Sequence, residues 1–158
     1  MLGIARAPVY LSGIQAEVPL ERESHLVEIH PNAAPQFFAW VIPAGEGRAR
    51  VGMCGTANVH EDFCRFVKPY LSSVTHLVTG TIPLGMMPQT YGRRTLFVGD
   101  AAGMAKPTSG GGVYTGVRAA RHAAAVAVSC CESDDFSDNA PADYERRWKE
   151  DLGREIGR

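Results

Sequence analysis

An acidic turn followed by a glycine-rich turn is the part of the sequence best suited to chemistry. Residues 99–103 read Gly-Asp-Ala-Ala-Gly, and residues 108–112 follow as Thr-Ser-Gly-Gly-Gly. A carboxylate at the end of a strand can accept hydrogen bonds from sugar-like hydroxyls. A glycine-rich turn that opens a helix offers backbone N–H groups to an electron-rich ligand edge. This combination suits a flavin better than a metal ion.

Asp100 also has a purely structural interpretation. An aspartate in this place can cap the next helix by accepting hydrogen bonds from its first N–H groups, and taken alone Asp100 favours that role. The three glycines at 110–112 shift the balance, because they cost conformational entropy that a structural turn rarely requires. Together the two turns favour a ligand site.

The first half of the chain predicts an antiparallel β-sheet. Residues 8–55 contain strand-like runs separated by proline, asparagine and glycine, and the last two runs form a predicted hairpin. Apolar residues at helical spacing predict a helix over 60–71. Strand-like composition then returns over 74–82, which we expect to complete the sheet.

The second half predicts one short strand and two helices. Residues 95–98 form a continuous apolar run, typical of a strand buried on both faces, after the polar turn 91–94. An alanine-rich helix is predicted over 112–128, and an acidic linker over 133–139. Pro141 opens the final helix. One face of this helix carries Tyr144, Trp148, Leu152 and Ile156.

Composition, net charge and the spacing of histidines and cysteines limit which partners and which cellular compartment we expect. The 158 residues are 45% apolar, the net charge is −1, and the basic residues are scattered, which argues against nucleic acid. The five histidines show no metal-ligand spacing, so no metal is predicted. Four cysteines without a CxxC pair indicate reduced thiols and a cytoplasmic protein. No apolar run approaches the roughly twenty residues of a membrane span, although a peripheral membrane contact stays open.

The two turns resemble a known family. Residues 96–103, Leu-Phe-Val-Gly-Asp-Ala-Ala-Gly, and 106–120, which begin Lys-Pro-Thr-Ser-Gly-Gly-Gly, are similar to the second FAD-binding motif of geranylgeranyl reductases. These are flavoproteins with a fold of the p-hydroxybenzoate hydroxylase type. The resemblance implies that Asp100 contacts the ribityl chain or pyrophosphate of FAD and that 110–112 lie near the pyrimidine edge of the flavin ring. The implied cofactor-binding residues are Gly99, Asp100, Ala101, Ala102, Gly103, Pro107, Gly110, Gly111 and Gly112.

A second resemblance lies upstream. The run Phe-Ala-Trp-Val-Ile-Pro at 38–43 is similar to the family's aromatic-x-Trp-x-Phe-Pro motif, with Phe38 in place of the usual tyrosine and Ile42 in place of phenylalanine. The resemblance implies that a prenyl-substrate cavity is lined by Phe38, Trp40, Ile42 and Pro43. Without the family, Phe38 and Trp40 are equally well explained as one face of a buried strand.

The resemblance implies an α+β fold in three parts. These are an antiparallel β-sheet substrate domain with one helix over 1–92, a strand–turn–helix piece of an FAD-binding α/β domain over 93–131, and a linker with an amphipathic helix over 132–158. Family members begin with a βαβ unit carrying GxGxxG, a pattern that this sequence lacks. We therefore expect a fragment, a truncated gene product or one piece of a split protein.

Three functions follow as hypotheses. The first is part of an FAD-dependent oxidoreductase that reduces isoprenoid double bonds of prenyl lipid precursors, with reduced ferredoxin or NAD(P)H as electron donor. The second keeps the fold but replaces the reaction with flavin-dependent hydroxylation or another electron transfer. The third is a non-catalytic β-sheet fragment that serves binding or assembly. No catalytic residue is assigned under any of them, and we expect the isolated chain to be inactive and to bind FAD weakly.

Overall fold

The computed structural model describes residues 7–34, 36–137 and 139–157, which form two compact units. The sheet unit comprises residues 11–81, and the helix unit comprises the residues before and after it. Strand β5 (Thr75–Leu84) extends past this limit, and the Met87 N–H then donates to the Ala102 carbonyl within the helix unit. The chain therefore changes unit at residue 82, ahead of the domain boundary that the sequence placed after residue 92.

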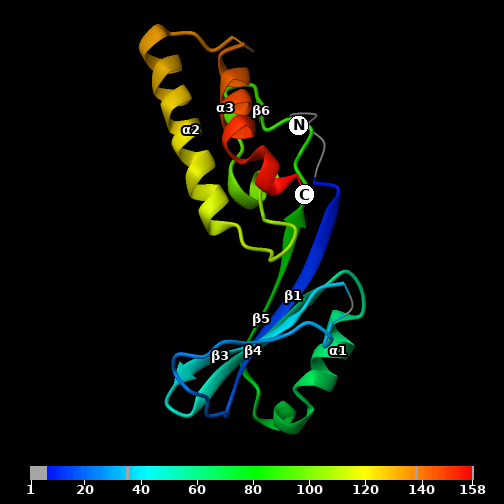
Figure 1. Ribbon diagram of the computed structural model, residues 1–158. Helices are drawn as coiled ribbons and strands as arrows, with labels where there is room; N and C mark the ends of the chain where they lie inside the picture. Colours follow the sequence, from blue (N-terminus) through cyan, green and yellow to red (C-terminus); the bar gives the residue numbers. More distant parts are fainter. Residues whose placement is uncertain (1–6, 35, 138, 158) are drawn as a thin grey trace. The chain divides into compact units, whose positions relative to one another are not determined.

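The sheet unit contains a five-stranded sheet in the order β2-β3-β4-β1-β5 (Figure 1). β1, β2, β3 and β4 pair antiparallel, and β3 and β4 form the predicted hairpin. This part of the α+β prediction is confirmed. The strands are β1 (Val9–Val18), β2 (Glu28–His30), β3 (Ala39–Gly45), β4 (Arg48–Gly55) and β5 (Thr75–Leu84).

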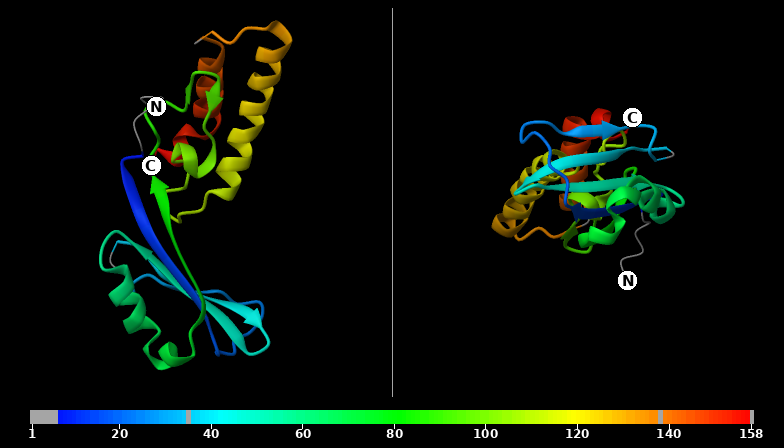
Figure 2. Two further views of the ribbon diagram at one scale, coloured as in Figure 1. Left: turned by 180° about the vertical axis from the view of Figure 1, so that it is seen from behind. Right: turned by 90° about the horizontal axis from the view of Figure 1, so that it is seen from below.

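A helix covers one face of this sheet (Figure 2). α1 (Val59–Phe66) packs Phe63 against a core built from alternate residues of β1, β3 and β4. The sequence predicted one helix over 60–71, but a 3₁₀ turn, η1 (Lys68–Ser73), follows α1 instead. Pro69 explains the break, because it has no N–H to donate to the carbonyl four residues earlier.

The helix unit pairs two long helices with a small β-hairpin. α2 (Val113–Ser133) and α3 (Asn139–Ile156) lie side by side (Figure 1). α2 extends beyond the predicted residue 128, and α3 begins two residues before the predicted Pro141. Strands β6 (Tyr91–Gly92) and β7 (Thr95–Leu96) form the hairpin. The expectation of a strand over 95–98 buried on both faces is wrong. Within the described residues β7 has β6 as its one paired strand, and its side chains are half-buried.

The apolar face of α3 forms the core of the helix unit, as its spacing predicted. Tyr144, Trp148, Leu152 and Ile156 are all at most 1% exposed. They belong to one apolar cluster with Ala102, Met104 and Ala119. Burial of this face is the main reason for α3 to lie where it does, because the rest of the helix is charged.

A buried polar network joins α3 to the hairpin. The Trp148 indole N–H donates to Thr90 Oγ1 at 2.8 Å. Thr90 in turn donates through its N–H and its hydroxyl to Glu145 Oε2, at 2.7 and 3.1 Å. The Tyr144 hydroxyl donates to the Phe97 carbonyl at 2.5 Å, and burial raises the pKa of Tyr144, which keeps it a donor. These bonds fix the chain on both sides of β6 and β7.

We predict that Thr90→Val destabilises the helix unit by about 1–3 kcal/mol, because it leaves the buried Trp148 N–H without its acceptor. Urea unfolding followed by fluorescence measures the change. Thr108→Val is the matched control, since Thr108 is exposed, and it should change the free energy of unfolding by less than about 0.5 kcal/mol. Equal effects of the two substitutions would contradict a structural role for the network.

Candidate functional site

The acidic turn forms a single turn of 3₁₀ helix. η2 (Gly99–Ala102) contains Asp100, and Gly103 ends it in the left-handed conformation, with φ 69°. The Gly103 N–H donates to the Asp100 carbonyl at 3.0 Å, and the Met104 N–H donates to the Gly99 carbonyl at 3.1 Å. A Cβ on residue 103 would lie 2.3 Å from the Gly85 carbonyl oxygen, so the turn tolerates only glycine there.

The glycine-rich turn folds back on itself and leads into α2. The Gly110 N–H donates to the Lys106 carbonyl at 2.8 Å, and the Lys106 N–H donates to the Gly111 carbonyl at 3.0 Å. Gly112 is the N-cap residue, immediately before α2. The predicted cofactor-binding residues 99–103, 107 and 110–112 therefore all lie in the helix unit, on η2 and the loop that joins it to α2.

The fully buried Thr115 forms hydrogen bonds that connect the start of α2 to the segment just after η2. Its hydroxyl lies 2.6 Å from the Met104 carbonyl oxygen and 3.1 Å from the Gly112 carbonyl oxygen. The sequence analysis did not single out Thr115. The available signal was a hydroxyl residue three positions after the last glycine of the loop, where its side chain can reach back toward the start of the helix.

The Asp100 carboxylate lies beside the start of α2 without capping it. A Cβ on Gly112 would approach Asp100 Oδ1 to 2.8 Å, so the carboxylate occupies the space that a side chain there would need. No side chain caps α2, and no hydrogen bond or ion pair to the Asp100 carboxylate is formed within the described part of the chain. The helix-capping interpretation of Asp100 is therefore wrong. An exposed acceptor and uncapped N–H groups lie side by side, as a ligand with donors and acceptors would require.

Two cations flank Tyr114 in the first turn of α2. The Lys106 ammonium lies 5.2 Å and the Arg118 guanidinium 5.9 Å from the centre of the Tyr114 ring. Both cations are held by acids of α3: Lys106 pairs with Glu155, and Arg118 forms two bonds to Asp151 at 2.6 and 3.1 Å. Because a carboxylate offsets each of these cations, the partial positive charge of the helix N-terminus is what favours an electron-rich ligand here.

Asp151 also accepts from His122, at 2.9 Å. The hydrogen bond with His122 and the bond and charge of Arg118 hold the pKa of Asp151 below its usual range. This carboxylate therefore ties α3 to two successive turns of α2.

The predicted substrate residues lie in the sheet unit, on β3 or next to it. Trp40 and Ile42 alternate with the buried Ala39 and Val41, which places them on the sheet face opposite α1. Phe38 precedes β3 and stacks on Phe37, and Pro43 lies where the β3–β4 register shifts. Phe38 and Trp40 are half-buried and lie outside the core cluster, which argues against their interpretation as one face of a buried strand.

The Trp40 ring lies across the backbone of β4. A Cβ on Gly52 would come within 2.4 Å of the ring, and the indole N–H donates to Gln15 Oε1 of β1 at 3.0 Å. The ring is therefore fixed in orientation over three strands. It gives this open face a rigid apolar surface.

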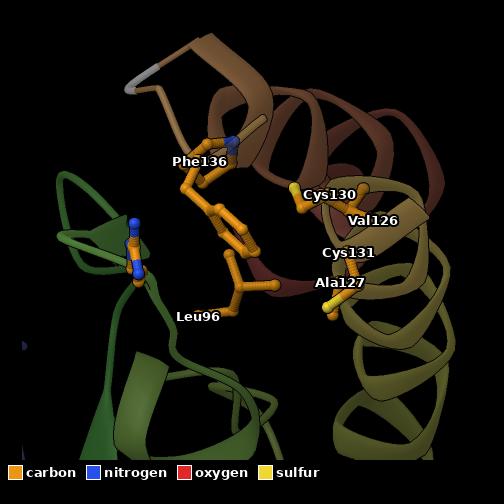
Figure 3. A pocket seen from close by; sticks show the side chains of 8 residues that line it. Leu96, Val126, Ala127, Cys130, Cys131 and Phe136 are labelled. Carbon is orange, nitrogen blue, oxygen red and sulfur yellow. The ribbon is translucent and has the colours of Figure 1, made fainter. Parts of the chain in front are cut away.

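The predicted residues do not line the cavity of the helix unit that is drawn in Figure 3. That cavity has a volume of about 200 Å³, and Leu96 and Phe136 face α2 across it. The Arg94 guanidinium lies 4.5 Å from the centre of the Phe136 ring. The remaining lining residues are Val126, Ala127, Cys130, Cys131 and Pro141.

Among the described residues, no group of three or more histidine, cysteine, aspartate or glutamate side chains is arranged so that it could hold a metal ion. None of the helices described is both long enough and apolar enough to cross a bilayer.

Comparison with known sequences finds relatives that are named as reductases. The chain is 34% identical over 143 residues to digeranylgeranylglycerophospholipid reductase 1 of Methanopyrus kandleri, covering 82% of this chain and 38% of that protein. It is 32% identical over 132 residues to digeranylgeranylglycerophospholipid reductase 2 of Methanothermobacter thermautotrophicus, covering 79% and 34%. The chain thus spans about a third of the length of these relatives. No family model matches the chain.

Solved structures show the same fold. A geranylgeranyl bacteriochlorophyll reductase-like protein of Thermoplasma acidophilum matches 94% of this chain and 41% of its own, with a TM-score of 0.83 and 26% identity. PqsL, a probable FAD-dependent monooxygenase of Pseudomonas aeruginosa, matches 99% of this chain and 48% of its own, with a TM-score of 0.67 and 13% identity. The second likeness shows the fold alone.

We predict that Gly103→Ala destabilises the helix unit by about 2–4 kcal/mol, because it adds a clash with the Gly85 carbonyl to the cost of a left-handed alanine. The matched control is Gly47→Ala. Gly47 has the same φ of 69° but no atom within 4 Å of the added methyl, so only the conformational cost of about 1 kcal/mol should appear. Urea unfolding of each variant measures the difference, and similar losses would contradict the close approach of residue 103 to Gly85.

We also predict that Asp151 contributes to acid sensitivity. Its pKa in the folded chain is lowered from an unfolded value near 3.9, so its contribution to stability is present above about pH 4 and is lost as pH falls through the folded pKa. Asp151→Asn should lower the thermal midpoint at pH 7 and reduce its fall between pH 5 and pH 2. Asp134→Asn, at an exposed residue after α2, is the control. Parallel midpoint curves for wild type and Asp151→Asn would refute the contribution.

Proposed function

The chain matches a segment of the geranylgeranyl reductase family, and from this premise we propose that it forms part of an FAD-dependent oxidoreductase acting on prenyl lipids. In this proposal the helix unit supplies the flavin-ring and ribityl part of the cofactor site. The sheet unit supplies an apolar wall for the substrate. The reaction is reduction of isoprenoid double bonds in a prenyl lipid precursor, which the names of the relatives support.

The observation that carries the proposal is the Asp100 carboxylate beside the uncapped start of α2, since this carboxylate has no hydrogen-bond or ion-pair partner among the described residues. Ribityl hydroxyls are donors that Asp100 can accept from, and the carbonyls of a flavin ring are acceptors for the N–H groups at a helix start. The absence of a side chain at Gly112 lets the Asp100 carboxylate lie this close to the start of α2. The residues present therefore fit FAD.

Bound FAD would supply hydride-transfer chemistry, and the chain's own residues would bind and orient it. Asp100 would hold the ribityl chain, and the turn 110–112 would lie against the pyrimidine edge of the ring. The partial positive charge at the start of α2 would lie near that edge, which favours an anionic reduced flavin. Trp40 and Ile42 would contact the apolar chain of the substrate, together with Phe38 and Pro43.

The proposal also covers the electron donor and the cellular location of the protein. A flavin-dependent reductase needs an electron donor, for which reduced ferredoxin and NAD(P)H are the two candidates. A prenyl lipid substrate also suits a cytoplasmic protein with a peripheral membrane contact, since such a substrate partitions into lipid.

Titration of flavins with the 158-residue chain tests the cofactor assignment. Because the residues present serve the ring and the ribityl chain, riboflavin and FAD should bind with similar dissociation constants, on the order of 0.1–1 mM, and ADP should not compete. Fluorescence anisotropy of the flavin gives the constants. Competition by ADP, or binding of FAD but not riboflavin, would show that the site recognises the adenosine end instead.

Asp100→Asn separates the role of the carboxylate from a general effect on folding. Loss of a charge-assisted hydrogen bond should weaken riboflavin binding about tenfold, with the circular dichroism spectrum unchanged. Asp134→Asn, also an exposed aspartate of the helix unit, should leave binding unchanged. Unchanged binding by the Asp100→Asn variant would remove Asp100 from the proposed site.

A further inference from the structure

The two edge strands of the five-stranded sheet are built differently. β2 has only three residues, and its Glu28 pairs with Arg22 and with His30. β5 has ten residues, none of them lysine, arginine, aspartate or glutamate. His76 has a left-handed backbone, with φ 47°, and Pro83 has no N–H, so the regular and uncharged part of this edge is residues 77–81. Short, charged edge strands resist pairing with other chains, whereas a long uncharged edge offers free N–H and C=O groups. β2 is therefore a protected edge, whereas residues 77–81 of β5 carry neither a charge nor a proline.

The sheet-unit part of β5 is open to a partner. The side chains of residues 75–81 are all exposed, including Leu77 at 55% and Val78 at 59%. In the sheet order β1 is the one strand next to β5 among the residues that the structure describes. The outer edge of β5 is thus free to extend the sheet.

A hollow of about 410 Å³ lies at the inner side of this edge. The small side chains that line it on the two strands include Ser12 on β1, and Thr79 and Thr81 on β5. Val59 and His60, at the start of α1, close one side. Since side chains alternate along a strand, Leu77 shares the face of Thr79 and Thr81, and so borders the hollow without filling it.

We propose that β5 of one copy of this chain pairs antiparallel with β5 of a second copy. Directly opposite residues in such a pair share a face of the sheet, so a two-fold axis at Val78 or Thr79 places Leu77 opposite Thr79 or Thr81 of the second copy. Each Leu77 then lies at the mouth of the other copy's hollow. One continuous sheet is formed across the two copies.

Charge and symmetry favour a second copy as the occupant. In a pair of β5 strands no formally charged side chain opposes another, and each Leu77 is offered a space lined by small residues. A two-fold contact uses the same surface on both sides, which this self-complementary edge supplies. A strand pair of this length buries less than the roughly 1,200 Å² of a standard interface, so the dimer should be weak, with a dissociation constant on the order of 10–100 µM.

Sedimentation equilibrium of the 158-residue chain between 5 and 500 µM tests the proposal. We expect a monomer–dimer equilibrium, and hydrogen exchange should show that the backbone amides of residues 75–81 gain protection as concentration rises. Leu77→Lys should raise the dissociation constant at least tenfold, because it places like charges close to the two-fold axis and removes the inserted side chain.

Ile29→Lys is the matched control. Ile29 is an apolar residue of the other edge strand and is similarly exposed, at 51%. This variant should dimerise as the wild type does, and circular dichroism should show both variants folded. A chain that stays monomeric up to 500 µM would overturn the proposal. So would a dimer that Ile29→Lys weakens as much as Leu77→Lys, or one that forms without added protection of residues 75–81.

Discussion

One buried hydroxyl holds the candidate cofactor site in shape. Thr115 joins the Met104 carbonyl, which follows the acidic turn, to the Gly112 carbonyl at the start of α2. Because Thr115 is fully buried, these bonds do not compete with water. The hydrogen bond from Thr115 to the Met104 carbonyl therefore helps to fix the position of Asp100 relative to the N-terminus of α2. Every chemical property that we assign to the two turns follows from their being held together.

α3 also stabilises the two turns and the start of α2. The apolar face of α3 packs against Ala102 and Met104, while Asp151 and Glu155 reach the cations on either side of Tyr114. The apolar contacts supply most of the stabilisation, since exposed ion pairs contribute little. The ion pairs instead orient Lys106 and Arg118, and so fix where these side chains lie around the first turn of α2. Packing and charge thus act on the same loop from one helix.

The sequence predicted features that depend on nearby residues, such as the buried face of a helix. It did not predict features that depend on contacts between distant residues. The four-residue spacing of Tyr144, Trp148, Leu152 and Ile156 predicted a buried helix face, and the structure confirms it. Nothing in the sequence near Thr115 identifies the Met104 carbonyl as its partner, because that contact exists only after the loop has folded. The expected strand at 95–98 is shorter in the structure because pairing depends on the neighbours available, which an apolar run does not specify. The cofactor roles of residues 99–112 stay predictions.

The contact between Trp40 and Gly52 also limits how this sheet can change in evolution. The indole occupies the space above residue 52, so any side chain larger than hydrogen there must displace the ring or its bond to Gln15. A smaller residue at position 40 would remove that constraint and expose the backbone of β4. The two positions are therefore expected to vary together, with glycine at 52 wherever tryptophan is kept at 40. Substitutions that reshape this face would have to arrive in a definite order, with position 40 changing before position 52.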